Sequence, residues 1–439
     1  MNQLTLKRMA FLVAFGLGAA GVFAEEPAAH TGPRHVSVEK TADGFRLRRD
    51  GKPYVIRGVG GRGRLDELVA AGGNSVRTWN ANHLEGTLDE AEKRGLSVTV
   101  GLWLGHERHG FDYSDPKQVA ADKERAREAV MRFKDHPAVL MWGIGNEMEA
   151  NGQNPKVWAA INDIARMIKE LDPNHPTMTV IAGTGDGKVG EFVKHCPDID
   201  VLGVNGYGDL AYIPRELKAQ GLDRPYVVTE FGPTGWWQVE KTSWGAEREP
   251  TSTEKAETYL AGYQTAVLDQ PDRCLGAYAF LWGNKQEHTH TWFGMFLPTG
   301  ERTAAVDVMT KVWTGDWPKN RCPAITDLRV QQATHDRPSA PLPEAIYPPG
   351  TPLIAKVEAK DPDDDPLTIT WDLRPESTDK RSGGDPEQAP APLPDAIVKA
   401  RRNVVRVNLP EQAGAYRLFV YVTDGHNNAA TANIPILVK

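Results

Sequence analysis

Residues 138–147 have the sequence Ala-Val-Leu-Met-Trp-Gly-Ile-Gly-Asn-Glu, and segments with helical periodicity flank them, Pro116–Phe133 before and Pro155–Leu171 after. The run is almost continuously apolar, which is typical of a parallel strand that is covered by helices on both faces. A helix, a strand and a helix in this order indicate an α/β fold. The polar pair Asn146-Glu147 stands where such a strand would leave the sheet.

The same alternation extends over residues 36–320. Short β-type runs occur at Tyr54–Val59, Asn74–Trp79, Leu96–Leu104, Ala138–Gly145, Thr177–Ala182, Val201–Asn205, Tyr226–Thr229 and Gly276–Trp282, and a segment of helical character follows each one. Eight such units predict a (β/α)₈ TIM barrel rather than an open doubly wound sheet. A hairpin that turns at Asp50-Gly51 is expected at its amino-terminal side.

Residues 321–439 have a different composition. They contain proline-rich stretches and short alternating runs without helical period, at Ile354–Val357, Leu367–Trp371, Ile397–Leu409, Tyr416–Val422 and Ala430–Leu437. This pattern predicts a small all-β, immunoglobulin-like sandwich. The polar, proline-rich segment Ser377–Pro394 is expected to be a mobile loop. The aspartates of Asp361–Leu367 could bind Ca²⁺, but a solvated turn between strands is favoured.

The amino terminus has the pattern of a secretory signal. Lys7 and Arg8 precede an apolar run, Met9–Phe23, and cleavage is expected after Ala24. The expected signal peptide is residues 1–24, and the mature protein is expected to be secreted or periplasmic without stable membrane insertion. The net charge of -7 argues against general nucleic-acid binding.

Cysteine usage excludes two classes of protein. The three cysteines, Cys196, Cys274 and Cys322, are too few for a disulfide scaffold and match no zinc-binding spacing. A bond between Cys274 and Cys322 and two buried free thiols are equally compatible with the sequence. We expect no metal and no organic cofactor.

Two glutamates end strands of the predicted barrel. Glu147 follows the fourth strand and Glu230 the seventh, in Val-Val-Thr-Glu-Phe-Gly. Active sites of such barrels collect at the carboxyl ends of the strands, so the two carboxyl groups are expected to face each other across the mouth. A pair of this kind suits cleavage of a glycosidic bond, with one group protonating the departing oxygen while the other attacks the anomeric carbon.

Asn-Glu after strand four and Glu-Phe-Gly after strand seven resemble the large clan of retaining (β/α)₈ glycosidases that includes glycoside hydrolase families 2 and 5. The resemblance covers residues 36–317 and implies that Glu147 is the acid/base and Glu230 the nucleophile. It also implies that Asn146 binds the sugar 2-hydroxyl. Family 2 enzymes typically carry β-sandwich domains ahead of the barrel, whereas here the predicted sandwich follows it.

Further substrate-binding residues follow from the resemblance and from position. The clan commonly has an arginine on strand two, an aromatic residue after strand six and a tryptophan on strand eight, which correspond to Arg77, Tyr207 and Trp282. Arg77 and Tyr207 would bond the carboxylate of the nucleophile and keep it ionised, and Trp282 would form a floor under the sugar. The predicted substrate-binding set is completed by Trp103 and His106 at the end of the third strand and by Trp236 and Trp237 after the seventh. A hydrogen-bonded structural role is an equally compatible interpretation of His106.

The predicted substrate is a carbohydrate, a β-linked oligo- or polysaccharide, with β-glucan favoured because aromatic rings stack on pyranose faces. A transglycosylase of the same mechanism and a non-catalytic glycan-binding protein remain alternatives. Gly185–Gly190 fits the dinucleotide pattern GxGxxG, but the next predicted strand ends in Asn205-Gly206-Tyr207 and lacks the expected acidic residue. A nucleotide-dependent function is therefore set aside.

Overall fold

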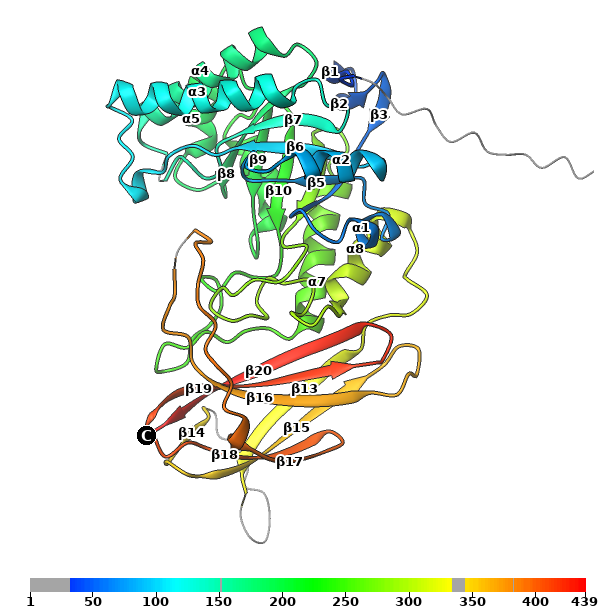
Figure 1. The fold of residues 1–439 in the computed structure, drawn as a ribbon, viewed down its shortest axis with the longest axis vertical. Coiled ribbons are helices and arrows are strands. Elements are labelled where there is room, and N and C mark those ends of the chain that lie inside the picture. Colours follow the sequence, from blue (N-terminus) through cyan, green and yellow to red (C-terminus); the bar gives the residue numbers. More distant parts are fainter. Residues whose placement is uncertain (1–31, 151, 334–343, 382) are drawn as a thin grey trace, which may run out of the picture. The chain divides into compact units, whose positions relative to one another are not determined.

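The computed structural model describes residues 32–150, 152–333, 344–381 and 383–439. Eight parallel strands close into a barrel in the order of the chain, which confirms the predicted (β/α)₈ architecture (Figure 1). Their bounds are β4 Ile56–Gly60, β5 Ser75–Arg77, β6 Ser97–Leu102, β7 Val139–Ile144, β8 Thr177–Ala182, β9 Val201–Asn205, β10 Tyr226–Phe231 and β11 Cys274–Ala279.

A helix follows every barrel strand. The eight are α1 Leu65–Ala70, α2 Glu85–Lys93, α3 Pro116–Phe133, α4 Pro155–Leu171, α5 Lys188–His195, α6 Ile213–Ala219, α7 Ser252–Tyr263 and α8 Ala304–Thr314. Side chains cap several of them. Asp115 accepts a hydrogen bond from the Lys117 amide at 2.9 Å and Asn154 one from the Lys156 amide at 3.1 Å, each just before a proline in the first turn. Such caps define where α3 and α4 begin.

A small antiparallel sheet covers the amino end of the barrel. It consists of β1 Val36–Thr41, β2 Gly44–Arg49 and β3 Lys52–Tyr54, and the predicted turn at Asp50-Gly51 has positive φ at both residues. Val36 and Leu47 pack into one apolar cluster with barrel residues such as Ile56 and Tyr278. The amino end of the barrel is therefore filled, and the carboxyl end is left for a site.

The carboxyl-terminal part is a two-sheet β-sandwich, as predicted. One sheet has the order β12-β20-β19-β16 with β14 beside β20, and the other has the order β13-β15-β18-β17. The bounds are β12 Arg302–Thr303, β13 Ala324–Gln332, β14 Ile346–Tyr347, β15 Pro352–Lys360, β16 Thr368–Pro375, β17 Ile397–Arg401, β18 Val404–Asn408, β19 Gly414–Thr423 and β20 Asn428–Val438. Inward side chains of both sheets, including Val357, Leu418 and Val405, form its core.

The barrel and the sandwich are joined by backbone and side-chain bonds. Strand β12, which precedes α8, pairs in parallel with β20, and the Thr431 amide donates to Ser252 Oγ at 2.8 Å. Residues 32–439 cluster as one compact unit. Among the residues described, no helix is both long and apolar enough to span a bilayer.

Some expectations need correction. The predicted strand Ile397–Leu409 is two strands, because Arg402 takes a positive φ of 49° and turns the chain between β17 and β18. Strand β13 was not predicted. Of the two alternatives for the cysteines, the structure has free thiols, since Cys196, Cys274 and Cys322 are all free and buried. The predicted signal peptide lies outside the described residues.

Candidate active site

Both glutamates emerge at the carboxyl end of the barrel. Glu230 is the fifth residue of β10, and Glu147 stands three residues after the end of β7. Gly145 and Glu147 have φ values of 70° and 53°, so the chain turns sharply after β7. A positive φ is uncommon for a residue with a side chain and is found where the surrounding structure enforces it, often at functional sites.

Glu230 is held as a carboxylate acceptor by three donors. Its Oε1 accepts hydrogen bonds from Arg77 Nη1 at 2.8 Å and from Trp79 Nε1 at 2.7 Å. Its Oε2 accepts one from the Tyr207 hydroxyl at 2.9 Å. The side chain is only 8% exposed and forms a buried ion pair with Arg77. Three donors hold this carboxyl group in a fixed position, which a nucleophile at a reacting carbon requires.

Glu147 has the opposite surroundings. Burial, together with the nearby charge of Glu230, raises the pKa of Glu147 to about 7, although a hydrogen bond from Asn205 works against this shift. That bond, from Asn205 Nδ2 to Glu147 Oε1, measures 2.8 Å. A carboxyl group with such a pKa can hold a proton near neutral pH and donate it.

Arg77 connects the two sides of the site. Its Nη1 bonds Glu230, and its Nη2 donates to Asn146 Oδ1 at 2.6 Å. Asn146 Oδ1 also accepts from Asn205 Nδ2 at 3.3 Å. Because its carbonyl is engaged in this way, the amide nitrogen of Asn146 is directed elsewhere and is available to a ligand.

A cavity of about 680 Å³ opens above the pair. It is lined by aromatic and polar groups from the strand ends and, unexpectedly, by the sandwich. The lining residues include Trp79, Trp103, Asn146, Glu147, Asn205, Tyr207, Asp209, Glu230, Trp236, Trp237, Phe280, Lys285, Glu287 and Gly383–Pro386. Its size is in the range of ligand sites in proteins.

The structure brings most of the predicted substrate-binding residues to this cavity, but not all. Trp103, Asn146, Tyr207, Trp236 and Trp237 line it, and Arg77 lies directly beneath as the partner of Glu230. Trp103 and Trp237 are among the most exposed large apolar side chains, at 41% and 49%. Exposed indoles at a cavity are suited to stacking on a sugar.

His106 and Trp282 lie outside the cavity lining. His106 is buried behind Trp103, with ring centroids 4.8 Å apart, and its Nδ1 faces Arg108 Nη1 at 2.9 Å. Burial and the charge of Arg108 lower the pKa of His106 to about 4. Trp282 packs edge-on against Phe296 and donates its Nε1 hydrogen to the Arg64 carbonyl at 3.0 Å. Phe280, which directly follows β11, takes the place at the cavity that was expected for Trp282.

Two residues of the site were overlooked in the sequence. Trp79 stands two positions after Arg77, and alternation along a strand would have placed both side chains on one face. Asn205 ends β9, and its two amide atoms connect Glu147 to Thr229, whose hydroxyl donates to Asn205 Oδ1 at 2.7 Å. Alternation from Arg77 could therefore have identified Trp79, and the polar residue at the end of a barrel strand could have identified Asn205.

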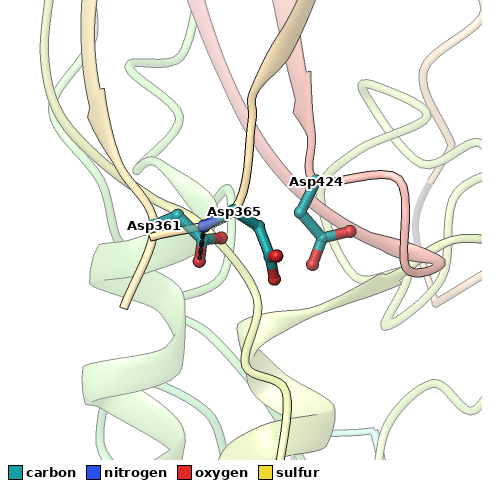
Figure 2. A group of neighbouring side chains, drawn as sticks. All are labelled: Asp361, Asp365 and Asp424. Atoms are coloured by element: carbon teal, nitrogen blue, oxygen red, sulfur yellow. Dashed lines mark hydrogen bonds between the residues drawn. The ribbon is translucent and has the colours of Figure 1, made fainter. Parts of the chain in front are cut away.

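One cluster of carboxylates is a candidate for a cation site. Asp361, Asp365 and Asp424 in the sandwich offer oxygens within 4.8 Å of one another (Figure 2). The same groups serve the turn itself: Asp361 Oδ1 accepts from the Asp363 amide at 2.8 Å, and Asp424 Oδ2 accepts from Asn428 Nδ2 at 2.6 Å. These contacts are those of a hydrogen-bonded turn.

Comparison with known proteins supports the interpretation of the site. Residues 87–272 match the TIM barrel domain of glycosyl hydrolases family 2. The barrel therefore resembles the barrel domain of family 2 glycoside hydrolases. A β-glucuronidase of Chlorocebus aethiops is 26% identical over 269 residues, which are 53% of this chain and 38% of that protein. A probable mannan endo-1,4-β-mannosidase A-1 of Aspergillus terreus is 29% identical over 163 residues, 34% of this chain and 38% of that protein.

The fold is also that of solved structures. A β-D-glucuronidase of Dictyoglomus thermophilum superimposes with a TM-score of 0.50 at 22% identity, over 65% of this chain and 54% of that one. The curated relatives are much longer, and the chain spans 38% of the length of each of the two named above. What is shared is therefore the catalytic barrel, and the sandwich that follows it here lies outside the matched family domain.

Proposed function

We propose that this protein is a retaining β-glycoside hydrolase that acts on an uncharged β-linked oligo- or polysaccharide. The observation that carries the proposal is the unequal treatment of two carboxyl groups in one cavity. Among the described residues, Glu230 accepts three hydrogen bonds, one of them from a buried arginine, while Glu147 accepts one and has a raised pKa. A carboxyl group with a raised pKa is suited to be the acid, and a carboxyl group that three donors hold in place is suited to be the nucleophile.

The reaction proceeds in two displacements. A Glu230 oxygen attacks the anomeric carbon, the bond from that carbon to the leaving oxygen breaks, and the Glu147 proton passes to that oxygen. Water then attacks the same carbon and gives a proton to Glu147. The bond to Glu230 breaks, and Glu230 returns as a carboxylate. The bonds from Arg77, Trp79 and Tyr207 stabilise Glu230 as the leaving group of this second step.

The charges at the cavity favour a neutral sugar. Among the described lining residues, the carboxyl groups belong to Glu147, Asp209, Glu230, Glu287 and Asp385, whereas Lys285 is the one cation. Lys285 Nζ already bonds Glu287 Oε2 at 2.7 Å and the Gly384 carbonyl at 2.8 Å. The carboxylate of a uronic acid would enter this surplus of negative charge without an unpaired cation to receive it.

β-Glucan is the favoured substrate within this class. Trp103, Trp236 and Trp237 present aromatic surface at the cavity. The ring substituents of β-glucose are all equatorial, so both of its faces are apolar and stack well on indoles. An axial hydroxyl in β-mannose interrupts one of those faces, which places β-mannan second.

Hydrolysis of defined substrates tests the proposal. Wild type, Glu230→Ala, Glu147→Ala and a matched surface control, Glu170→Ala, are incubated with glucose, mannose and glucuronic acid compounds of β-linkage. We expect cleavage of the uncharged compounds by wild type and control, and strong loss in the two site variants, all four being folded by circular dichroism. Preferred cleavage of the glucuronide would overturn the substrate class, and cleavage that survives in Glu230→Ala would overturn the mechanism.

A further inference from the structure

The loop between β16 and β17 reaches from the sandwich to the active-site cavity (Figure 1). Four consecutive residues of this loop, Gly383–Pro386, line the same cavity as Glu147 and Glu230. We propose that this loop forms a substrate-binding wall of the cleft, in which Asp385 binds the hydroxyls of a sugar unit beyond the one that is cleaved. The inference rests on the proposed function, since it assigns the site a longer substrate.

Several bonds hold the wall against the barrel rim. Asp385 Oδ2 lies 3.1 Å from His109 Nε2, and Asp385 Oδ1 lies 3.9 Å from Arg108 Nη2. The Gly384 carbonyl accepts from Lys285, and Glu387 Oε2 accepts from the His288 amide at 2.7 Å. The segment thus spans from the turn after β6 to the loop after β11. Its described residues are tied down, in contrast to the mobile loop that the sequence suggested.

Two glycines allow the backbone to come this close. Gly383 and Gly384 have φ values of 65° and 73°, which side chains disfavour. A Cβ atom at Gly383 would lie 2.8 Å from the Arg108 guanidinium, and one at Gly384 would lie 3.0 Å from Lys285 Nζ. The approach to the rim therefore depends on residues without a side chain.

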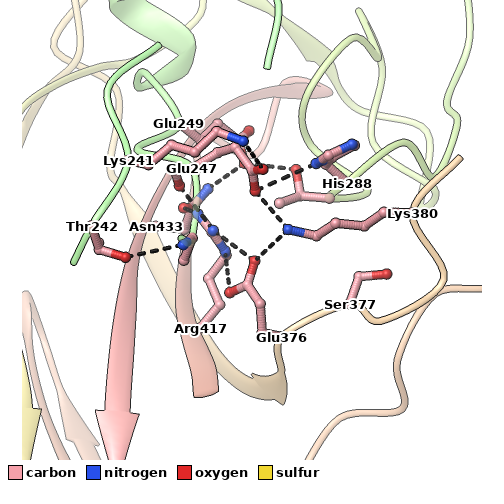
Figure 3. A network of polar contacts seen from close by, with 12 residues as sticks. Lys241, Thr242, Glu247, Glu249, His288, Glu376, Ser377, Lys380, Arg417 and Asn433 are labelled. Atoms are coloured by element: carbon pink, nitrogen blue, oxygen red, sulfur yellow. Dashed lines mark hydrogen bonds and ion pairs between the residues drawn. The ribbon is translucent and has the colours of Figure 1, made fainter. Parts of the chain in front are cut away.

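A buried charge network anchors the base of the loop (Figure 3). Glu247, which follows β10 and is 2% exposed, bonds Lys380 Nζ at 2.6 Å and faces His288 Nδ1 at 3.4 Å. Arg417 of β19 donates to the Glu247 carbonyl and makes two bonds to Glu376 at 2.8 and 3.0 Å. Burial alone would raise the pKa of Glu247, but the bonds from His288 and Lys380 hold it below its ordinary value.

The same network touches the aromatic side of the cavity. His288 stacks on Trp236 with ring centroids 3.9 Å apart, and Trp236 Nε1 donates to Glu287 Oε1 at 3.3 Å. The base of the loop and a predicted sugar-stacking residue are therefore parts of one packed unit. Packing and hydrogen bonds from surrounding residues of this kind keep a binding side chain in place.

Asp385 has the chemistry of a sugar-binding group. A carboxylate accepts several hydrogen bonds, and Oδ1 has no closer cation than Arg108 Nη2 at 3.9 Å, so it can accept from a sugar hydroxyl. Its contacts are with the turn after β6 rather than with the glutamates or their hydrogen-bond partners. It therefore serves a sugar next to the cleaved one.

The test compares short with long substrates. Wild type, Asp385→Ala and Gly384→Val are assayed with 4-nitrophenyl β-hexosides, which carry one sugar, and with cellopentaose and mannopentaose. Loss of a hydrogen bond to a charged group is expected to lower kcat/KM for the pentasaccharide about tenfold. The one-sugar substrates are expected to change less than about twofold. Asp395→Ala, an exposed aspartate at the far end of the same loop, is the matched control and should match wild type on both.

The outcomes separate this inference from the proposed function. An equal effect of Asp385→Ala on both substrate lengths, or no effect on either, overturns the inference while the hydrolase stands. If wild type cleaves nothing, the proposed function fails, and pentasaccharide binding is then followed by tryptophan fluorescence. Weaker binding by Asp385→Ala than by Asp395→Ala would still support the proposal that the loop binds substrate through Asp385. Equal binding by the two variants, or no binding at all, would overturn it.

Discussion

The ends of β7 and β10 carry the same side chain in two different settings. At β10, Glu230 lies within the strand and meets an arginine, an indole and a phenol. At β7, Glu147 lies past the strand end and meets one amide, from Asn205. The first setting stabilises a charge and the second disfavours one. Identical carboxyl groups thus acquire different roles from their neighbours.

Removal of Glu230 is expected to have the largest effect. Without the nucleophile no glycosyl-enzyme forms, so kcat for Glu230→Ala should fall by about 10⁴-fold or more. The loss should be as large for dinitrophenyl as for nitrophenyl glycosides. Steady-state kinetics with both leaving groups measure it. A loss that depends strongly on the leaving group would contradict the role of Glu230.

Removal of Glu147 should depend on the leaving group. General acid assistance is worth about 10²–10⁴-fold, so hydrolysis of an oligosaccharide by Glu147→Ala should fall by about 10³-fold. Formation of the glycosyl-enzyme from a dinitrophenyl glycoside needs no proton donor and should fall by less than about tenfold. Pre-steady-state release of dinitrophenol is the measurement. Equal losses with both substrates would remove the distinction between the two glutamates.

Arg77→Met tests the support of Glu230. It leaves a carboxylate buried without its cation, which should lower kcat/KM by about 10²-fold and stability by about 3 kcal/mol in urea unfolding. The double variant Arg77→Met/Glu230→Gln should regain stability but not activity, because it removes the unpaired charge. If Arg77→Met is as stable as wild type, the ion pair does not stabilise the buried carboxylate of Glu230.

The pH dependence should report Glu147. Since its pKa is raised to about 7, kcat/KM should fall as pH rises above 7, where the acid loses its proton. The folded protein holds this proton more tightly than the unfolded chain, so the stability that it contributes is present below the ordinary value of 4.5 and is lost as pH rises through about 7. Glu147→Gln should therefore become more stable relative to wild type over this interval, by up to about 3 kcal/mol. Parallel urea titrations at pH 4 and pH 8 check the sign.

The barrel was predictable because its strands are long apolar runs with polar ends. Thr177–Ala182 and Val201–Asn205 were predicted with the bounds of β8 and β9. The same regularity places Arg77, Tyr207 and Glu230 at one rim, since the carboxyl ends of all parallel barrel strands meet there. Local sequence patterns were therefore sufficient to predict the fold and the residues at the centre of the site.

Two kinds of feature were not predictable. The side-chain direction of Trp282 depends on the course of the chain beyond β11, which turns its indole to the Arg64 carbonyl. Asp385 reaches the cavity only because the sandwich packs on the barrel through contacts such as Arg417 with Glu247. Contacts between regions far apart in sequence leave no periodic signal.

Azide rescue tests the difference between the two glutamates most directly. In Glu230→Ala, azide is expected to take the place of the nucleophile and yield an α-glycosyl azide from an activated β-glycoside. In Glu147→Ala, azide is expected to attack the glycosyl-enzyme and yield the β-glycosyl azide. Nuclear magnetic resonance of the products distinguishes the two. The same anomer from both variants, or products reversed between them, would contradict the assignment of Glu230 as nucleophile and Glu147 as acid.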